Sequence, residues 1–168
     1  LFGFRYITTT TKKLMDEGVV AKLHINCVHV KYDNILPVAK DYKKEIDWIV
    51  ARKERNEFII DLANKVEGNV LILFSLVEKH GKVLLDIAKQ KGGKEIFFVY
   101  GGTDADAREK IRKLAETHSG CIILASYQTF STGVSVRNLH YLMLASPTKS
   151  YTRVVQSIGR GLRVSDSK

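Results

Sequence analysis

Long apolar runs are missing from this sequence. No stretch approaches the roughly 18 consecutive apolar residues that a membrane-spanning helix needs, so we expect no membrane association. The first residues, Leu1-Phe2-Gly3-Phe4-Arg5, contain no initiator methionine and do not follow the layout of a secretory signal peptide. We therefore expect a soluble, globular piece of a longer protein.

Cysteine is scarce as well. The chain has two, Cys27 and Cys121, far apart and in apolar surroundings, so buried free thiols in a reducing compartment are expected rather than a disulfide. None of the five histidines forms a pair with metal-ligand spacing. No metal site is predicted.

Two glycine-rich nucleotide motifs are also absent. There is no Gly-x-Gly-x-x-Gly at the first strand-to-helix turn, which argues against a Rossmann-type metabolic enzyme. There is no Gly-x-x-x-x-Gly-Lys-[Ser/Thr] phosphate loop, because Gly93-Lys94 is followed by Glu95 and lacks the earlier glycine. Asp16-Glu17 is not at an expected strand end, so it is a poor candidate for a Mg²⁺-binding motif.

Positive charge, in contrast, is in excess. The 168 residues contain 27 Lys and Arg against 18 Asp and Glu, a net charge of +9. Residues 1–68 contain 12 basic and 10 acidic side chains, whereas residues 69–168 contain 15 and 8. A basic domain favours a polyanionic partner such as nucleic acid, although solubility alone accounts for part of the charge.

The second part of the chain alternates between short apolar runs and amphipathic segments. Buried strands are expected at Val70–Phe74, Ile96–Tyr100, Cys121–Ala125 and Tyr141–Ala145. Helices are expected at 78–90, 105–117 and from Ser150 onward. This alternation predicts an α/β fold, a parallel sheet with helices on both faces.

The first part is less regular. A short helix is expected at 12–17, with a threonine cap and Gly18 at its end. Residues 19–32 are rich in β-branched side chains and are expected to form a strand. Residues 39–67 are expected to form two helices or one bent helix, in which the charged run Arg52–Arg55 is a solvated face.

Residues 150–163 concentrate cationic side chains. In a helix, Arg153, Gln156, Arg160 and Arg163 share one face. The opposite face then holds Tyr151, Val155, Ile158 and Leu162. Paired guanidinium groups on a rigid face suit the phosphates of a nucleotide, while a solvated basic face is the simpler alternative. Gly159 would cost about 1 kcal/mol in a helix and makes sense where a ligand approaches the backbone.

Polar and small residues follow each expected strand. They are Ser75, Gly101-Gly102-Thr103, the stretch from Ser126 to Gly133, and the stretch from Ser146 to Lys149. The carboxyl ends of parallel strands meet at one edge of a sheet, where ligands commonly bind. Each loop alone could be ordinary turn chemistry, but four together could hold a nucleic-acid backbone without reading its sequence.

In this order, the motifs resemble those of the second RecA-like motor domain of superfamily-two helicases. Gln156-x-x-Gly159-Arg160-x-x-Arg163 has the form of motif VI, whose arginines act in that family as fingers on the ATP γ-phosphate. Ser126 to Val136 resembles motif V, although Ser135 stands where many relatives carry Asp or Asn. Leu71 to Gly81 resembles motif IV, and Tyr100-Gly101-Gly102 with Arg108 resembles the segment after it.

Most of the chain is similar in particular to UvsW-type phage recombination helicases. The likeness rests on residues 2–15, Ala125-Ser126-Tyr127, Phe130-Ser131-Thr132-Gly133 and the closing arginine motif, and it is weakest over residues 33–64. It implies an ATP-driven DNA translocase that unwinds or branch-migrates recombination and replication intermediates. Residues 1–20 would be the exit from an absent first motor domain and its linker. Residues 21–168 would form the second motor domain, whose sheet would normally continue further.

The resemblance also assigns roles to individual residues. The catalytic residues would be Arg160, Arg163 and Gln156. Contacts to the nucleotide would come from Gly133, Ser135 and Gly159. Contacts to nucleic acid would come from Ser75, Gly101, Gly102, Arg108, Ser126 and Thr132.

The same resemblance names ligands and partners. ATP and Mg²⁺ would bind mainly to the absent first motor domain, so this chain alone should be inactive. Its partners would be that first lobe and branched or partly single-stranded DNA, in the cytoplasm, or in the host cytoplasm if a phage encodes it. A non-catalytic nucleic-acid-binding module is the alternative, which explains the charge but gives no role to the paired arginines.

Overall fold

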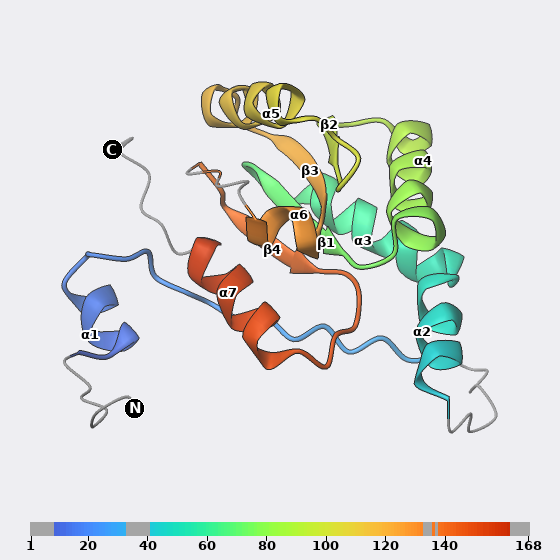
Figure 1. Cartoon of the computed structure of the whole chain (residues 1–168), viewed down its shortest axis with the longest axis horizontal. Coiled ribbons are helices and arrows are strands. Elements are labelled where there is room, and N and C mark those ends of the chain that lie inside the picture. The colour runs from blue at the N-terminus through green and yellow to red at the C-terminus, as the bar shows by residue number, and fades with distance from the viewer. Residues whose placement is uncertain (1–8, 33–40, 133–135, 137, 162–168) are drawn as a thin grey trace.

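The core of the molecule is a four-stranded parallel sheet. The computed structural model describes residues 9–32, 41–132, 136 and 138–161. Its strands are β1 (Val70–Phe74), β2 (Glu95–Val99), β3 (Cys121–Ser126) and β4 (Tyr141–Leu144), in the spatial order β2-β3-β1-β4 (Figure 1). Each adjacent pair of strands is parallel, and the four strands match the four apolar runs of the sequence. The predicted α/β fold is confirmed.

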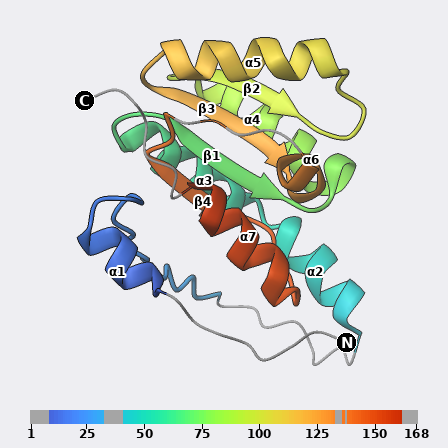
Figure 2. The same ribbon diagram turned by 60° about the vertical axis from the view of Figure 1, so that its left-hand side comes forward.

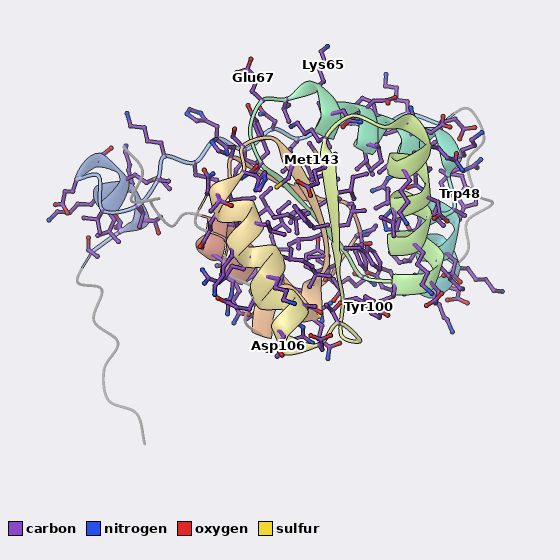
Figure 3. The ribbon with its side chains drawn as sticks, turned by 90° about the horizontal axis from the view of Figure 1, so that it is seen from above. Trp48, Lys65, Glu67, Tyr100, Asp106 and Met143 are labelled. Carbon is purple, nitrogen blue, oxygen red and sulfur yellow. The ribbon has the colours of Figure 1, made fainter. Side chains whose placement is uncertain are left out.

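Helices cover both faces of this sheet. On one face, α5 (Ala105–Thr117) and α6 (Tyr127–Thr132) pack on alternate strand residues such as Leu71 and Ile123. On the other, α3 (Lys53–Lys65) and α4 (Lys82–Lys91) pack on the intervening ones, such as Ile72. Figure 3 shows α4 and α5 on opposite sides of the strands. Burial on both faces explains why β1 and β3 are continuous apolar runs.

The strands at the two edges of the sheet are more exposed than the two central strands. β4 was expected to be buried, but Tyr141 is 43% exposed, and Glu95 at the start of β2 is exposed as well. Among the described residues, β4 pairs only with β1 and therefore forms an edge of the sheet. The helix α7 (Tyr151–Gly161) contacts β4 and α6, and Figure 2 shows it beside this edge strand.

The segment before the sheet corrects two predictions. The short helix is present as α1 (Thr11–Asp16), capped by the Thr10 hydroxyl, which accepts from the Lys13 N–H at 3.2 Å. The strand expected at 19–32 is wrong over these described residues, which form an irregular segment from α1 toward α2 (Figure 1). β-branched residues form a strand only where a neighbouring strand pairs with them, and Ile25 is 68% exposed. Cys27 is exposed rather than buried, whereas Cys121 is buried, and both thiols are free.

Two helices precede β1, which confirms the first of the two alternatives, two helices rather than one bent helix. They are α2 (Tyr42–Val50), capped by Asp41, and α3. The charged run between them is only partly a solvated face. The guanidinium of Arg52 lies 4.0 Å from the centre of the Trp48 ring, and Arg55 donates a hydrogen bond to the carbonyl oxygen of Ala145.

The turn after β1 also departs from a regular helix. Residues Val77–Gly81 form a π-helical turn, η1, which leads directly into α4. A Cβ at Gly81 would lie 2.5 Å from the Phe74 ring, so only glycine fits at this close approach. The π-helical turn brings His80 into the interior, where it is fully buried. None of the described helices is long and apolar enough to cross a membrane.

Candidate functional site

The carboxyl ends of β1, β2 and β3 surround a cavity of about 320 Å³, which we call the edge cavity. Its described lining residues are Ser75, Val77, Tyr100, Gly101, Ser126, Tyr127, Gln128 and Arg153. The fold therefore brings together three of the residues predicted to bind nucleic acid, Ser75, Gly101 and Ser126. It adds Arg153 from α7, which the sequence analysis placed on the cationic helix face but gave no role in the site.

The turn after β2 is held by the predicted nucleic-acid-binding residue Arg108. Its Nε donates to the Thr103 carbonyl at 2.8 Å and its Nη2 to the Gly101 carbonyl at 3.2 Å. A Cβ at Gly102 would lie 2.6 Å from the Tyr100 ring. Arg108 thus braces the turn, and its contact with nucleic acid stays a prediction.

The turn after β3 uses hydroxyl groups to start α6. The Ser126 and Thr129 hydroxyls lie 2.8 Å apart, and the Thr129 N–H donates to the Ser126 hydroxyl at 3.2 Å. Thr132 ends α6, but its side chain lies outside the described residues, as do Gly133 and Ser135.

Tyr127 forms a wall of the edge cavity. Its hydroxyl donates to the Ser146 carbonyl at 3.2 Å, and burial raises the pKa of Tyr127 to about 12. The Arg153 guanidinium carbon lies 5.9 Å from the centre of its ring, within the range of a cation–π contact. Tyr127 therefore stays neutral at physiological pH and presents its ring to Arg153.

A chain of hydrogen bonds runs beneath the edge cavity. The Ser75 N–H donates to the Ser146 hydroxyl at 2.9 Å, and that hydroxyl lies 2.8 Å from Nδ1 of His80. Nε2 of His80 lies 3.2 Å from Oδ1 of Asn56, whose Nδ2 donates to the Val50 carbonyl at 2.8 Å. Every group has a partner if His80 is neutral and carries its proton on Nε2, so that the Ser146 hydroxyl donates to Nδ1.

The surroundings of His80 support this neutral form. Burial, followed by the positive charge of Arg55, lowers the pKa of His80 to about 4. Sequence reasoning missed this network, although a signal was present. His80 lies four residues before the buried Leu84 and eight before the buried Ala88, and Asn56 lies four residues before the buried Ile60. Both His80 and Asn56 are therefore polar residues on the inward face of a helix.

The helix α7 carries the remaining predicted residues. Gln156 and Gly159 are exposed, Arg160 is partly exposed, and Arg163 lies outside the described residues. The predicted apolar face is only partly correct: Tyr151 is 81% and Val155 46% exposed, Ile158 is partly buried, and Leu162 lies outside the described residues. The inward residues are Ile158 together with Val154 and Ser157.

Two observations bear on what this helix could bind. A Cβ at Gly159 would meet no atom within 4 Å, so packing does not require the glycine. The helix contacts α6 and β4 and contributes Arg153 to the edge cavity. No cluster of three or more metal-binding side chains occurs within the residues that the structure describes.

Comparisons with known proteins agree with this geometry. Residues 54–165 match the helicase conserved C-terminal domain. The ATP-dependent DNA helicase uvsW of Enterobacteria phage T4 is 39% identical over 174 residues, which cover the whole of this chain and 34% of that protein. The pre-mRNA-processing ATP-dependent RNA helicase PRP5 of Lodderomyces elongisporus is 23% identical over 92% of this chain and 16% of its own length.

The folds can also be compared directly. The crystal structure of T4 UvsW superposes with a TM-score of 0.64 at 40% sequence identity, covering 75% of this chain and 26% of that one. The chain thus spans about a third of the length of its phage relative. From the family match and the parallel sheet that carries it, we conclude that this chain belongs to the helicase conserved C-terminal domain family.

Proposed function

We propose that this chain is the second motor lobe of an ATP-dependent DNA helicase or translocase that acts on branched recombination and replication intermediates. The observation that carries the proposal is that the strand-end loops of a parallel sheet and Arg153 of α7 line one cavity, since α7 is the helix that also carries Gln156-x-x-Gly159-Arg160. DNA is preferred to RNA because the phage DNA helicase is 39% identical and the RNA helicase 23%.

In this proposal, α7 completes a nucleotide site between two lobes. Residues 1–20 connect to a first motor lobe, which holds most of the ATP and its Mg²⁺, and residues 21–168 form the second lobe. Arg160 and Arg163 contact the γ-phosphate, Gln156 orients the nucleotide, and Gly159 allows close approach to the helix. Gly133 and Ser135 contact the nucleotide from the loop after α6. Guanidinium groups suit this role because they stay charged and bind phosphate oxygens in pairs.

The edge cavity and its rim hold the DNA. Ser75, Gly101 and Ser126 lie at three adjacent strand ends. Gly102 in the turn after β2, Arg108 in α5 and Thr132 at the end of α6 are the further contacts in this proposal. Neutral donors at the ends of parallel strands contact phosphates without reading bases, as a translocase requires.

The test is Arg160→Ala in the full-length protein that carries both lobes. We expect DNA-stimulated ATP hydrolysis to fall by about 10³-fold or more, because the variant lacks a charge that stabilises the transition state. DNA affinity should stay close to that of the parent. Lys89→Gln, on the far end of α4, is the control and should hydrolyse ATP normally. Equal ATPase activity of Arg160→Ala and the parent would refute the assignment.

A further inference from the structure

Arg153 has a distinctive position among the basic residues of this chain. It lines the edge cavity, and none of the other described lining residues is charged. In the described part of the chain no ion pair involves Arg153, whereas Arg112 on α5 bonds both Glu109 and Glu116. No carboxylate among the described residues therefore neutralises the charge of Arg153.

The guanidinium of this exposed residue has one aromatic neighbour. It lies 5.9 Å from the ring centre of Tyr127, which is itself buried and bonded to the Ser146 carbonyl. The backbone below it is braced as well, since the Arg153 N–H donates to the Ser150 hydroxyl and its carbonyl accepts from Ser157 at 2.8 Å. A positioned guanidinium loses less entropy on binding an oxyanion than a mobile lysine would.

The rest of the cavity offers neutral polar groups. Ser75 contributes its hydroxyl, because its N–H is already donated to Ser146. Gln128 and the Gly101 turn line the same space. One cation among neutral polar groups matches a single phosphodiester, which carries one negative charge, better than a triphosphate.

We propose that Arg153 binds one backbone phosphate of the DNA in the edge cavity, and so links the DNA to the helix that carries Arg160. This inference rests on the proposed function and adds a residue to it. The two arginines are separated by seven residues, about 10 Å along the helix axis. One end of α7 therefore contacts DNA while the next two turns face the nucleotide.

The experiment compares variants of this 168-residue chain by fluorescence anisotropy with a labelled single-stranded oligonucleotide and a duplex at several salt concentrations. Arg153→Gln should weaken binding about tenfold at low salt. It should also reduce the slope of log K against log salt by about 0.7 for the single strand and about 0.9 for the duplex, the value for one phosphate. Arg153→Lys, which keeps the charge, should restore most of the slope.

Lys89→Gln removes the same charge far from the cavity and should leave the slope unchanged. Thermal unfolding midpoints of the Arg153 variants should stay close to the parent's. An unchanged slope in Arg153→Gln, or an equal loss in Lys89→Gln, would overturn the proposal while the parent's binding still supports the proposed function.

Two further outcomes separate this inference from the proposed function. A parent chain with no DNA affinity at low salt would count against both. In the two-lobed protein, Arg153→Gln should leave the affinity for a non-hydrolysable ATP analogue unchanged. A variant that loses analogue binding but keeps its DNA affinity would assign Arg153 to the nucleotide and overturn the inference.

Discussion

The two ends of the sheet use their polar groups in opposite ways. At the amino ends of the strands, the two N–H groups of the Asn69 side-chain amide are shared among the carbonyls of Ala115, His118 and Asn138, and its oxygen accepts from the N–H groups of Gly120 and Cys121. Lys94 donates to the carbonyls of Val66 and Gly68. Figure 3 shows Lys65 and Glu67 at this end and Tyr100 at the other.

At the carboxyl ends, the loops leave a cavity lined by hydroxyls, a glycine turn and an arginine. The two ends differ in which groups make hydrogen bonds to the backbone N–H and carbonyl groups. At the amino end, the side chains of Asn69 and Lys94 make hydrogen bonds to backbone groups of the protein itself, so this end contributes to stability. The carboxyl end has the hydrogen-bond network of His80 next to its turns and leaves a cavity open above the strand ends, where we propose that DNA binds.

The largest effect is expected at the amino end. Asn69→Ala should lower the free energy of unfolding by about 3 to 5 kcal/mol, because it leaves several buried N–H and carbonyl groups without partners. Chemical denaturation measures the loss. At temperatures where the variant is folded, it should bind DNA with the same salt dependence as the parent. A changed salt dependence under these conditions would contradict the claim that the amino end contributes only to stability.

A pH titration tests the support beneath the cavity. The unfolded chain takes up a proton at His80 near pH 6.5, whereas burial delays this to about pH 4 in the folded chain. The unfolded state therefore binds more protons between these values, and stability falls as pH decreases from 6.5 to 4. The loss should be on the order of 3 kcal/mol and should be absent in His80→Gln. Parallel stability curves for the parent and His80→Gln would show that His80 does not titrate in this way.

Ser146→Ala should have a smaller effect that reaches the ligand surface. It removes the acceptor for the Ser75 N–H and the donor to His80, at a cost of about 2 kcal/mol. DNA affinity should fall as well, because the turn after β1 loses its anchor. The control is Thr117→Ala, whose hydroxyl donates to carbonyl oxygens of its own helix, α5, and whose loss should leave DNA affinity unchanged. Equal DNA affinity of Ser146→Ala and the parent would show that the network does not position this turn.

The smallest expected effect on stability separates folding from function most sharply. Gly159→Ala should stabilise the chain by about 0.5 to 1 kcal/mol, because alanine favours a helix and its Cβ meets open space. In the full-length protein the same change should reduce ATPase activity if the nucleotide approaches Gly159. Stability is read from thermal unfolding, and a variant with unimpaired ATPase activity would remove Gly159 from the nucleotide site.

Local patterns predicted most of the fold. The apolar runs located all four strands, and Thr10 and Gly18 bounded α1 as expected. These features could be predicted because a helix cap or a buried strand depends on residues that are close together in the sequence. The same patterns failed over residues 19–32. That segment has strand propensity, but a strand also needs a partner, and the described residues provide none.

Prediction of the candidate site was less complete. The strand-end loops were expected to meet, and Ser75, Gly101 and Ser126 do line one cavity. The guanidinium of Arg108 bonds to the turn of Gly101 and Thr103, which the sequence did not predict, and its contact with nucleic acid stays a prediction. The inward face of α7 was assigned from hydrophobicity, and the buried Ser157 shows that its direction depends on contacts with neighbouring elements.

The sequence by itself determined the alternation of strands and helices, the parallel sheet and the arginine motif of its last described helix, since each depends on short-range spacing. Only the tertiary structure decided that Arg153 reaches the strand ends and that His80, Asn56 and Ser146 form one chain beneath them. His80 and its two hydrogen-bond partners, Asn56 and Ser146, lie 24 and 66 positions apart in the sequence. Hydrogen bonds over such separations depend on how the helices pack on the sheet, which no local pattern records.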